Sequence, residues 1–415
     1  MTLRRLAFLP GLLACLALAG CPSDDFENFG NSSTGGEGGG NGDLVGDDAR
    51  RAVLADIGSD IILPALRDFA DDADALQSAM SAHAAAPNDD QALMAARDAW
   101  RAAMLGWQRN EVLQVGPAGR STGLDTTPGG ADLRGQIYTF PFRTPCQIDL
   151  AALEDREVNA NTAINIKGLG AIEYLLFFEG PNPDCPPPSG ADLVAKRAQY
   201  ASRLADFIAS VADDLVNRWS PSGGNFLAEW STAGAGSDVY MRPQEALDAL
   251  SVALFYAEKI TKDDKIADPT GIGATGLTPC PTASCPERLE SRLSMTSGAN
   301  IRANVQAFRD VFTGVDDGMG VNDLLRGIGR DELADDLVTE LDATLEQLAA
   351  LDPDFDAAVA AIPDATQCMN ASANRTGLPV CKLHGDITAA MDIFRGPIVS
   401  ALSLATPNAA AGDND

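Results

Sequence analysis

Residues 204–215, LADFIASVADDL, carry the pattern that decides the fold. Their larger apolar side chains recur at i, i+4, i+7 and i+11, a spacing that places them on one face of an α-helix. These residues are Leu204, Ile208, Val211 and Leu215. Alternating Val, Ile and Thr patterns, which are typical of strands, are scarce in the rest of the chain. The sequence therefore predicts an all-α protein.

Three earlier segments show the same helical character. They cover about residues 53–66, 89–113 and 164–178. Pro64 interrupts the first of them, and we expect a kink there, since proline removes a helix hydrogen bond. With the helix around residues 204–215, these segments predict a four-helix bundle over residues 49–220.

A second bundle is expected in the other half of the chain. Residues 219–242 are rich in glycine and proline and interrupt the helical pattern. The pattern resumes at Pro243, a favourable residue for a first helical turn, and continues to about residue 404. We therefore expect two packed helical bundles, the second over residues 241–405.

The N-terminus has the three parts of a secretory signal. Arg4 and Arg5 are followed by an apolar run over residues 6–18 and by small residues before Cys21. A cysteine at this place resembles a bacterial lipobox, in which the cysteine is lipidated. We expect residues 1–20 to be a lipoprotein signal peptide; an ordinary signal peptide that ends near a cysteine is the alternative.

Residues 21–48 are expected to form a flexible tether. The segment contains almost no apolar residues and includes a glycine-rich run over residues 35–40, so it has nothing with which to build a core. A lipidated Cys21 would attach the protein to a lipid membrane. The sequence thus predicts a cell-envelope location, either facing the periplasm or at the outer membrane.

The charge of the chain bears on its partners. The formal net charge is −29 at pH 7, which disfavours binding to nucleic acid because the phosphate backbone is also negative. Such acidity is compatible with cation binding and equally with a solvated acidic surface.

Cysteine usage fits an exported protein. Six cysteines follow Cys21 in the chain, and an even number favours disulfides. Fifteen pairings are possible, of which local pairing is the simplest: Cys146–Cys185, Cys280–Cys285 and Cys368–Cys381. A metal cluster is the weaker alternative, because no CxxC spacing occurs and the chain has only two histidines, His83 and His384.

Two segments stand out as candidates for chemistry, although the signatures HExxH, GxxxxGK[ST] and HxxEH are all absent. In the first, Trp100, Trp107 and Glu111 share one helix face. In the second, Glu173 is embedded in an apolar run. A buried carboxylate is costly unless it is paired or bound to a cation. We therefore expect both glutamates to be partly or fully buried and partnered.

These segments resemble the imelysin-like proteins, a group of exported bacterial proteins. The first part of the resemblance consists of Trp100, Trp107, Glu111 and the following Gly116-Pro117. The second is a loop with Arg143, Cys146 and Asp149. The third is a helix in which Gly168 and Glu173 match the ends of the family motif GxHxxE. Over residues 50–400 the resemblance implies two helical bundles and a link to iron uptake, and some members are labelled peptidases.

The chain departs from the motif at one position. Gly170 stands where the family has histidine, so the imidazole that would ligate a metal or act as a base is missing. We therefore expect a non-enzymatic, envelope-anchored binding protein tied to iron or metal acquisition, with an envelope protein of a metal-uptake system as partner. A peptidase of the imelysin type and a purely structural or interaction module are the alternatives.

The expected site lies where the helices of Glu111 and Glu173 meet. Two neighbouring carboxylates need a cation, an arginine or a shared proton, and Arg109 and Arg143 are the candidate partners. Trp100, Trp107, Gly168 and Gly170 would support the site. Without a histidine, oxygen ligands would dominate, which suits a hard cation such as iron or calcium better than zinc. A pure salt-bridge role remains the alternative.

Overall fold

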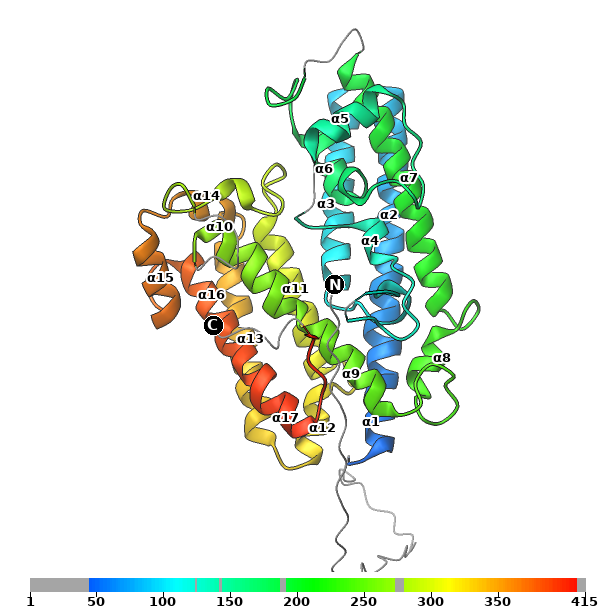
Figure 1. The fold of residues 1–415 in the computed structure, drawn as a ribbon, viewed down its shortest axis with the longest axis vertical. Helices are drawn as coiled ribbons and strands as arrows, with labels where there is room; N and C mark the ends of the chain where they lie inside the picture. Colours follow the sequence, from blue (N-terminus) through cyan, green and yellow to red (C-terminus); the bar gives the residue numbers. More distant parts are fainter. Residues whose placement is uncertain (1–44, 124, 142–143, 187–191, 273–279, 409–415) are drawn as a thin grey trace, which may run out of the picture. The chain divides into compact units, whose positions relative to one another are not determined.

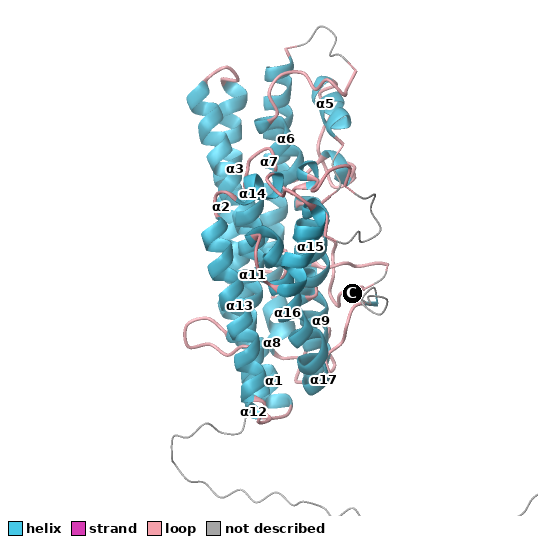
Figure 2. Ribbon diagram, turned by 90° about the vertical axis from the view of Figure 1, so that its left-hand side faces the viewer, coloured by secondary structure: helices cyan, strands magenta, loops and turns pink. Residues whose placement is uncertain are grey.

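The structure is a computed structural model that describes residues 45–123, 125–141, 144–186, 192–272 and 280–408. Every regular element in these ranges is helical, and none is a strand (Figure 2). The all-α prediction is confirmed. The signal segment, Cys21, most of the tether and Arg143 lie outside the described residues. No helix in the described ranges is long and apolar enough to cross a membrane.

A first group of helices packs around α2. The long helices are α1 (Asp47–Asp56), α2 (Leu63–Ala85), α3 (Asp90–Asn110), α6 (Leu169–Phe177) and α7 (Leu193–Trp219). The shorter elements are η1 (Ile57–Ile62), η2 (Gly116–Ala118), α4 (Arg134–Ile137), α5 (Pro145–Leu153) and η3 (Ile164–Ile166). Helix α2 packs on α3 and α7, and α6 packs on the same two helices. Leu204, Ile208, Val211 and Leu215 are all buried along α7, as their spacing predicted.

The second group packs around α16. It contains α9 (Pro243–Leu254), η4 (Ala257–Ala267), α10 (Asp268–Thr270), η5 (Pro286–Arg288), α11 (Ser297–Thr313), α12 (Val321–Gly327), α13 (Asp331–Leu351), α14 (Phe355–Ala360), α15 (Ala365–Asn374), α16 (Pro379–Ile393), η6 (Phe394–Ile398) and α17 (Val399–Leu402). Helix α16 packs on α13, α15 and η4. The groups meet where α11 contacts α3 and where α1 contacts α9 (Figure 1). The boundaries at 49–220 and 241–405 stay a prediction.

The glycine- and proline-rich stretch over residues 219–242 is more ordered than its composition indicates. It contains α8 (Phe226–Ser231), and its aromatic rings pack in one buried cluster of Trp219, Phe226, Trp230 and Tyr240. The Trp230 indole donates a hydrogen bond of 2.7 Å to the carbonyl of Leu54 in α1. This stretch therefore belongs to the core.

The helix that carries Glu173 begins later than its sequence predicts. The expected helix over residues 164–178 is a short 3-10 turn followed by α6, which starts at Leu169. Between them Gly168 has φ +78, a left-handed conformation that favours glycine. A Cβ atom at this position would lie 2.5 Å from the carbonyl oxygen of Ile137. Glycine is thus required both for the turn and for the close approach of the two backbones.

Three disulfides stabilise loops and short helices. They join Cys146 to Cys185, Cys280 to Cys285 and Cys368 to Cys381, the partners that local pairing also gives. The bonds join residues 39, 5 and 13 positions apart, so the first restricts the unfolded chain over the longest loop.

Candidate functional site

Glu111 is completely buried at the end of α3, where its carboxylate is held by an arginine and a tryptophan. Arg134, the first residue of α4, donates from Nη2 to Glu111 Oε2 at 2.7 Å and from Nε to Oε1 at 3.3 Å. The indole of Trp107, one turn earlier in α3, donates to the same carboxylate. Burial lowers the pKa of Arg134, but the charge and hydrogen bond of Glu111 outweigh it and raise that pKa. The guanidinium of Arg134 therefore stays charged beside Glu111.

A second buried ion pair lies at the junction of the two groups of helices. Lys265 Nζ in η4 lies 3.0 Å from Glu290 Oε1, and both side chains are completely buried. Glu290 also accepts hydrogen bonds from the Tyr138 hydroxyl at 2.7 Å and from the Gln108 amide at 3.0 Å. Lys265 donates in turn to Gln108 Oε1 at 2.7 Å and to Asn304 Oδ1 at 2.8 Å. Every proton of the Lys265 ammonium thus has an acceptor.

We call Glu111, Arg134, Gln108, Lys265 and Glu290 the lysine cluster. Its members come from α3, α4, η4 and the loop before α11, so it spans the junction of the two groups. Burial lowers the pKa of Lys265, and the charges of Glu290 and Glu111 oppose that shift. The two carboxylates are balanced by two cations, which is the usual condition for burying charge.

Glu173 belongs to a different set of residues, built from hydroxyl groups. Its Oε1 accepts hydrogen bonds from the Ser294 backbone N–H at 3.2 Å and from the Ser294 hydroxyl at 3.0 Å. Nearby, the Ser297 hydroxyl donates to Asp356 Oδ2 at 2.9 Å. We call Glu173, Ser294, Ser297 and Asp356 the serine cluster.

In the serine cluster, Asp356 has a raised pKa. Burial and then the charge of Glu173 raise its pKa to about 6. Its Oδ1 atom is buried and has no hydrogen-bond partner among the described residues. A carboxylate oxygen in this situation is stabilised by a proton or by a cation.

The sequence-predicted residues are only partly brought together. Glu111 and Glu173 are both completely buried, but they take their hydrogen bonds from different residues. Arg109, expected beside them, is exposed and lines a cavity of about 140 Å³ with Asp60, Asp68 and Asp310. The prediction of Arg109 as the partner of Glu111 is therefore wrong, since Arg134 fills that role. Arg143 lies outside the described residues.

The residues predicted to support the site hold neighbouring helices in position. The Trp100 indole donates to the Leu169 carbonyl at 2.9 Å, which fixes α3 against the start of α6. Gly170 is buried within α6, one turn before Tyr174. Asp149, from the loop of the resemblance, forms a two-point ion pair with Arg197 of α7 at 2.7 and 2.8 Å. These contacts hold α5, α6 and α7 together.

The histidines have other surroundings. His384 in α16 places Nδ1 2.8 Å from the Ser372 hydroxyl of α15. His83 is buried near the end of α2, where burial lowers its pKa. In the part of the chain that the structure describes, no group of three or more His, Cys, Asp or Glu side chains is arranged to hold a metal ion. A cation at the serine cluster would thus need hydroxyl, backbone or water oxygens as well.

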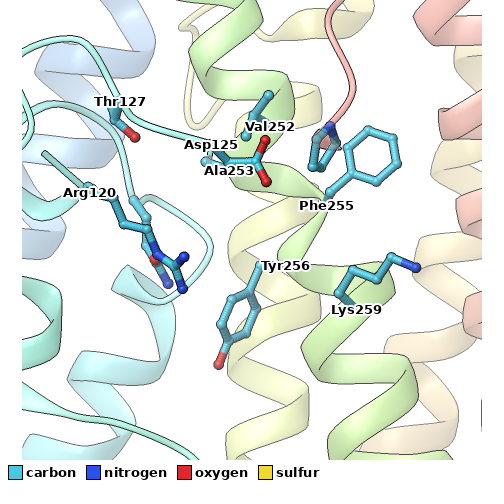
Figure 3. Close-up of a pocket in the computed structure, with 11 residues that line it drawn as sticks. Arg120, Asp125, Thr127, Val252, Ala253, Phe255, Tyr256 and Lys259 are labelled. Atoms are coloured by element: carbon cyan, nitrogen blue, oxygen red, sulfur yellow. The ribbon is translucent and has the colours of Figure 1, made fainter. Parts of the chain in front are cut away.

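An open cavity of about 270 Å³ lies beside the lysine cluster (Figure 3). Arg120, Asp125 and Thr127 line it from the loop after α3, while Tyr256 and Lys259 line it from η4 and the residue before it. Burial, followed by the charges of Glu111 and Glu290, holds the pKa of Tyr256 well above its ordinary value. Tyr256 therefore stands as a neutral phenol between the cavity and the lysine cluster.

Sequence reasoning missed Arg134, Lys265, Glu290 and Asp356. Lys265 lies in AEKITKDDKIA, residues 257–267, a charged segment that resembles a solvated helix surface. The structure forms a π-helix there, and this geometry buries Lys262 and Lys265 together. π-Helical turns occur often at functional sites, but no side-chain spacing in this segment indicates one.

A family model described as imelysin, with the label Peptidase_M75, matches residues 62–376. No curated protein sequence matches the chain at a significant level.

Two solved structures share the fold. One, provisionally described as an iron-regulated protein A precursor, is from Parabacteroides distasonis; it is 17% identical with a TM-score of 0.62, and the match covers 84% of this chain and 96% of that one. The other is an imelysin-like protein from Psychrobacter arcticum, 18% identical with a TM-score of 0.61, covering 87% of this chain and 98% of the other. At these identities the likeness shows the fold alone.

Proposed function

The chain belongs to the imelysin family, and we propose that it is an exported, lipid-anchored binding protein that takes part in the acquisition of iron or another metal. The family membership supports this proposal, as does the fold shared with a structure whose description refers to iron regulation. A lipidated Cys21 would hold the protein on a lipid membrane, and an envelope protein of a metal-uptake system is the proposed partner.

The serine cluster carries the proposal. Glu173 and Asp356 are buried carboxylates close enough for one to raise the pKa of the other, and Asp356 Oδ1 has an unfilled lone pair. The surrounding donors are oxygens, from the carboxylates and the hydroxyls of Ser294 and Ser297. An all-oxygen set favours hard cations such as Fe³⁺ or Ca²⁺ over zinc.

Protons and cations would compete for this cluster. With a pKa of about 6, Asp356 holds its proton below that pH and releases it above. Cation affinity should therefore rise as the pH rises from 5 to 7.5. The lysine cluster offers no such exchange, because its carboxylates are already paired with Arg134 and Lys265.

Equilibrium dialysis tests the metal-binding part of the proposal. The full chain is dialysed at pH 5 and at pH 7.5 against Ca²⁺, Mg²⁺, Zn²⁺ and Fe³⁺, the last supplied as a chelate. We expect one hard cation to bind more tightly than about 1 mM, which corresponds to roughly −4 kcal/mol, and only at the higher pH. Binding of zinc alone, or equal binding at both pH values, would contradict the proposal.

The peptidase label of the family calls for a direct assay. Unfolded protein substrates are incubated overnight with the full chain, with and without zinc. We expect no cleavage, because Gly170 leaves α6 without the imidazole of the family motif. Metal-dependent cleavage that disappears in Glu173→Ala would establish a peptidase instead.

A further inference from the structure

The chain following α17 runs in extended form beside α9 (Figure 1). Polar side chains on one face of α9 bind its backbone. The Ser251 hydroxyl donates to the Ala405 carbonyl at 2.7 Å, and Asp248 Oδ1 accepts from the Ala405 N–H at 2.9 Å. One turn earlier, the Gln244 amide donates to the Ser403 carbonyl at 3.1 Å. This face of α9 therefore binds main-chain groups of Ser403 and Ala405.

The opposite wall of the groove also binds this segment. Asp125 Oδ1 accepts hydrogen bonds from the Asn408 backbone N–H at 2.8 Å and from the Asn408 side-chain amide at 2.9 Å. Pro407 is the buried side chain between these two anchor points, and it lines the cavity of Figure 3 with Phe255 and Tyr256. Thr406 and Asn408 are exposed.

These contacts have the chemistry of peptide recognition. Hydrogen bonds to the backbone bind an extended chain whatever its side chains are. A proline ring packs in an apolar pocket beside aromatic side chains. The groove is also wider than the segment it holds. Cavities of about 270 and 420 Å³ border residues 405–408, and they share Asp125, Thr127 and Val252 as lining residues.

We propose that this groove is a binding site for an extended, proline-containing segment of a partner protein, and that residues 403–408 occupy it in cis. Charged side chains of both signs line the groove: Asp125, Glu245 and Asp248 are acidic, and Arg120 and Lys259 are basic. The partner segment is therefore neutral, like residues 402–408, LSLATPN, which occupy the groove. This inference is independent of any metal site.

Because residues 403–408 occupy the groove in cis, they lower the affinity of the intact protein for a partner segment. A tethered segment competes at an effective concentration on the order of 1 mM, so a partner in trans binds weakly until the segment is released. Loosening the segment in the full chain should therefore expose the site. Ala405→Pro removes the N–H that donates to Asp248.

Fluorescence anisotropy with a labelled synthetic peptide of residues 402–408 tests the site. We expect the full chain with Ala405→Pro to bind this peptide at least tenfold more tightly than the unchanged chain. Adding Asp248→Ala should abolish that gain. The double variant Pro407→Gly with Asn408→Ala should also weaken binding of the segment in cis, and we expect it to bind the peptide as tightly as Ala405→Pro does. It keeps the test decisive if Ala405→Pro does not fold.

Backbone methylation of the peptide distinguishes specific binding in this groove from non-specific binding. Methylating the nitrogen that corresponds to Ala405 removes its hydrogen bond to Asp248, and we expect at least a tenfold loss of affinity. Methylating the nitrogen of Thr406, for which no hydrogen bond is described, should leave the affinity within about threefold. Equal binding of both methylated peptides, or no gain in either loosened chain, would overturn the proposal. A dimer of the unchanged chain that the free peptide dissociates would overturn it too, because a second copy would then be the occupant.

Discussion

The lysine cluster and the serine cluster bury similar groups but neutralise them differently. In the lysine cluster, Glu111 and Glu290 are paired with Arg134 and Lys265, so its charges balance. In the serine cluster, the described hydrogen bonds come from hydroxyl and backbone groups, and Asp356 has a raised pKa. A balanced cluster holds the fold together, whereas Asp356 in the other cluster can exchange a proton or a cation. Function should therefore reside in the cluster that contains Asp356, the carboxyl with the raised pKa.

The largest effect is expected from breaking the lysine cluster at its centre. Lys265→Met leaves the buried charge of Glu290 without its cation. Loss of one partner from a buried pair costs about 3–5 kcal/mol of unfolding free energy. Urea unfolding followed by circular dichroism at pH 7.5 measures the change.

Two controls accompany this variant. Adding Glu290→Gln to Lys265→Met removes the orphaned charge and should recover at least half of the loss. Lys196→Met removes a partly exposed ion pair with Asp155 and should cost less than about 1 kcal/mol. If Lys265→Met is as mild as Lys196→Met, the lysine cluster does not stabilise the fold in the way we describe.

Removing Arg134 should have a smaller effect in the same cluster. Its side chain retains 19% exposure, so water can partly solvate Glu111 once the guanidinium is gone. We expect Arg134→Gln to cost about 2–3 kcal/mol, below the range for fully buried pairs. The same urea titration compares it with Lys265→Met, and the reverse order of the two losses would contradict the burial argument.

In the serine cluster, removing a charge should stabilise the protein. The folded-state pKa of Asp356, about 6, is above its ordinary value of 3.8, so the folded state binds the extra proton between these values. Stability linked to this group is complete below pH 3.8 and is lost as the pH rises through 6. Asp356→Asn should thus raise the free energy of unfolding by about 1–2 kcal/mol at pH 8 and leave it unchanged near pH 4.

Thermal unfolding at several pH values checks this sign. Asp354→Asn, an exposed residue two positions earlier, makes the same change in net charge and should show no comparable pH dependence. A gain that is equal at pH 4 and pH 8 would show that the effect does not come from the titration of Asp356.

The smallest effect is expected from Glu173→Gln. The glutamine oxygen can still accept the two hydrogen bonds from Ser294, and the charge that raises the pKa of Asp356 disappears. We expect a change in unfolding free energy of less than about 1 kcal/mol, measured by urea titration. A loss of 3 kcal/mol or more would show that interactions of Glu173 other than those with Ser294 stabilise the fold.

The fold and the burial of both glutamates could be predicted from local patterns. The spacing of Leu204 and Ile208 fixes a helix face, and Glu173 lies in an apolar run that has to enter the core. The partners could not be predicted, because they come from distant parts of the chain. Ser294 is 121 residues from Glu173, and the charged segment around Lys265 has no apolar spacing that indicates burial.

One error in the prediction has a specific physical cause. Arg109 lies two residues before Glu111, and helical geometry directs such neighbours to different faces. Arg134 instead reaches Glu111 from α4, whose position depends on the loop between residues 112 and 133. Loop paths of this kind are not encoded by side-chain periodicity.

Isothermal titration of the cation that binds in dialysis, at pH 7.5, tests most directly whether the serine cluster is the functional one. The unchanged chain is compared with Asp356→Asn, Glu173→Gln and the exposed control Asp354→Asn. We expect the first two variants to lose at least tenfold in affinity, about 1.4 kcal/mol, while the control stays within twofold. Unchanged affinity in Asp356→Asn and Glu173→Gln, or no cation that binds more tightly than about 1 mM, would contradict a metal-binding role for this cluster.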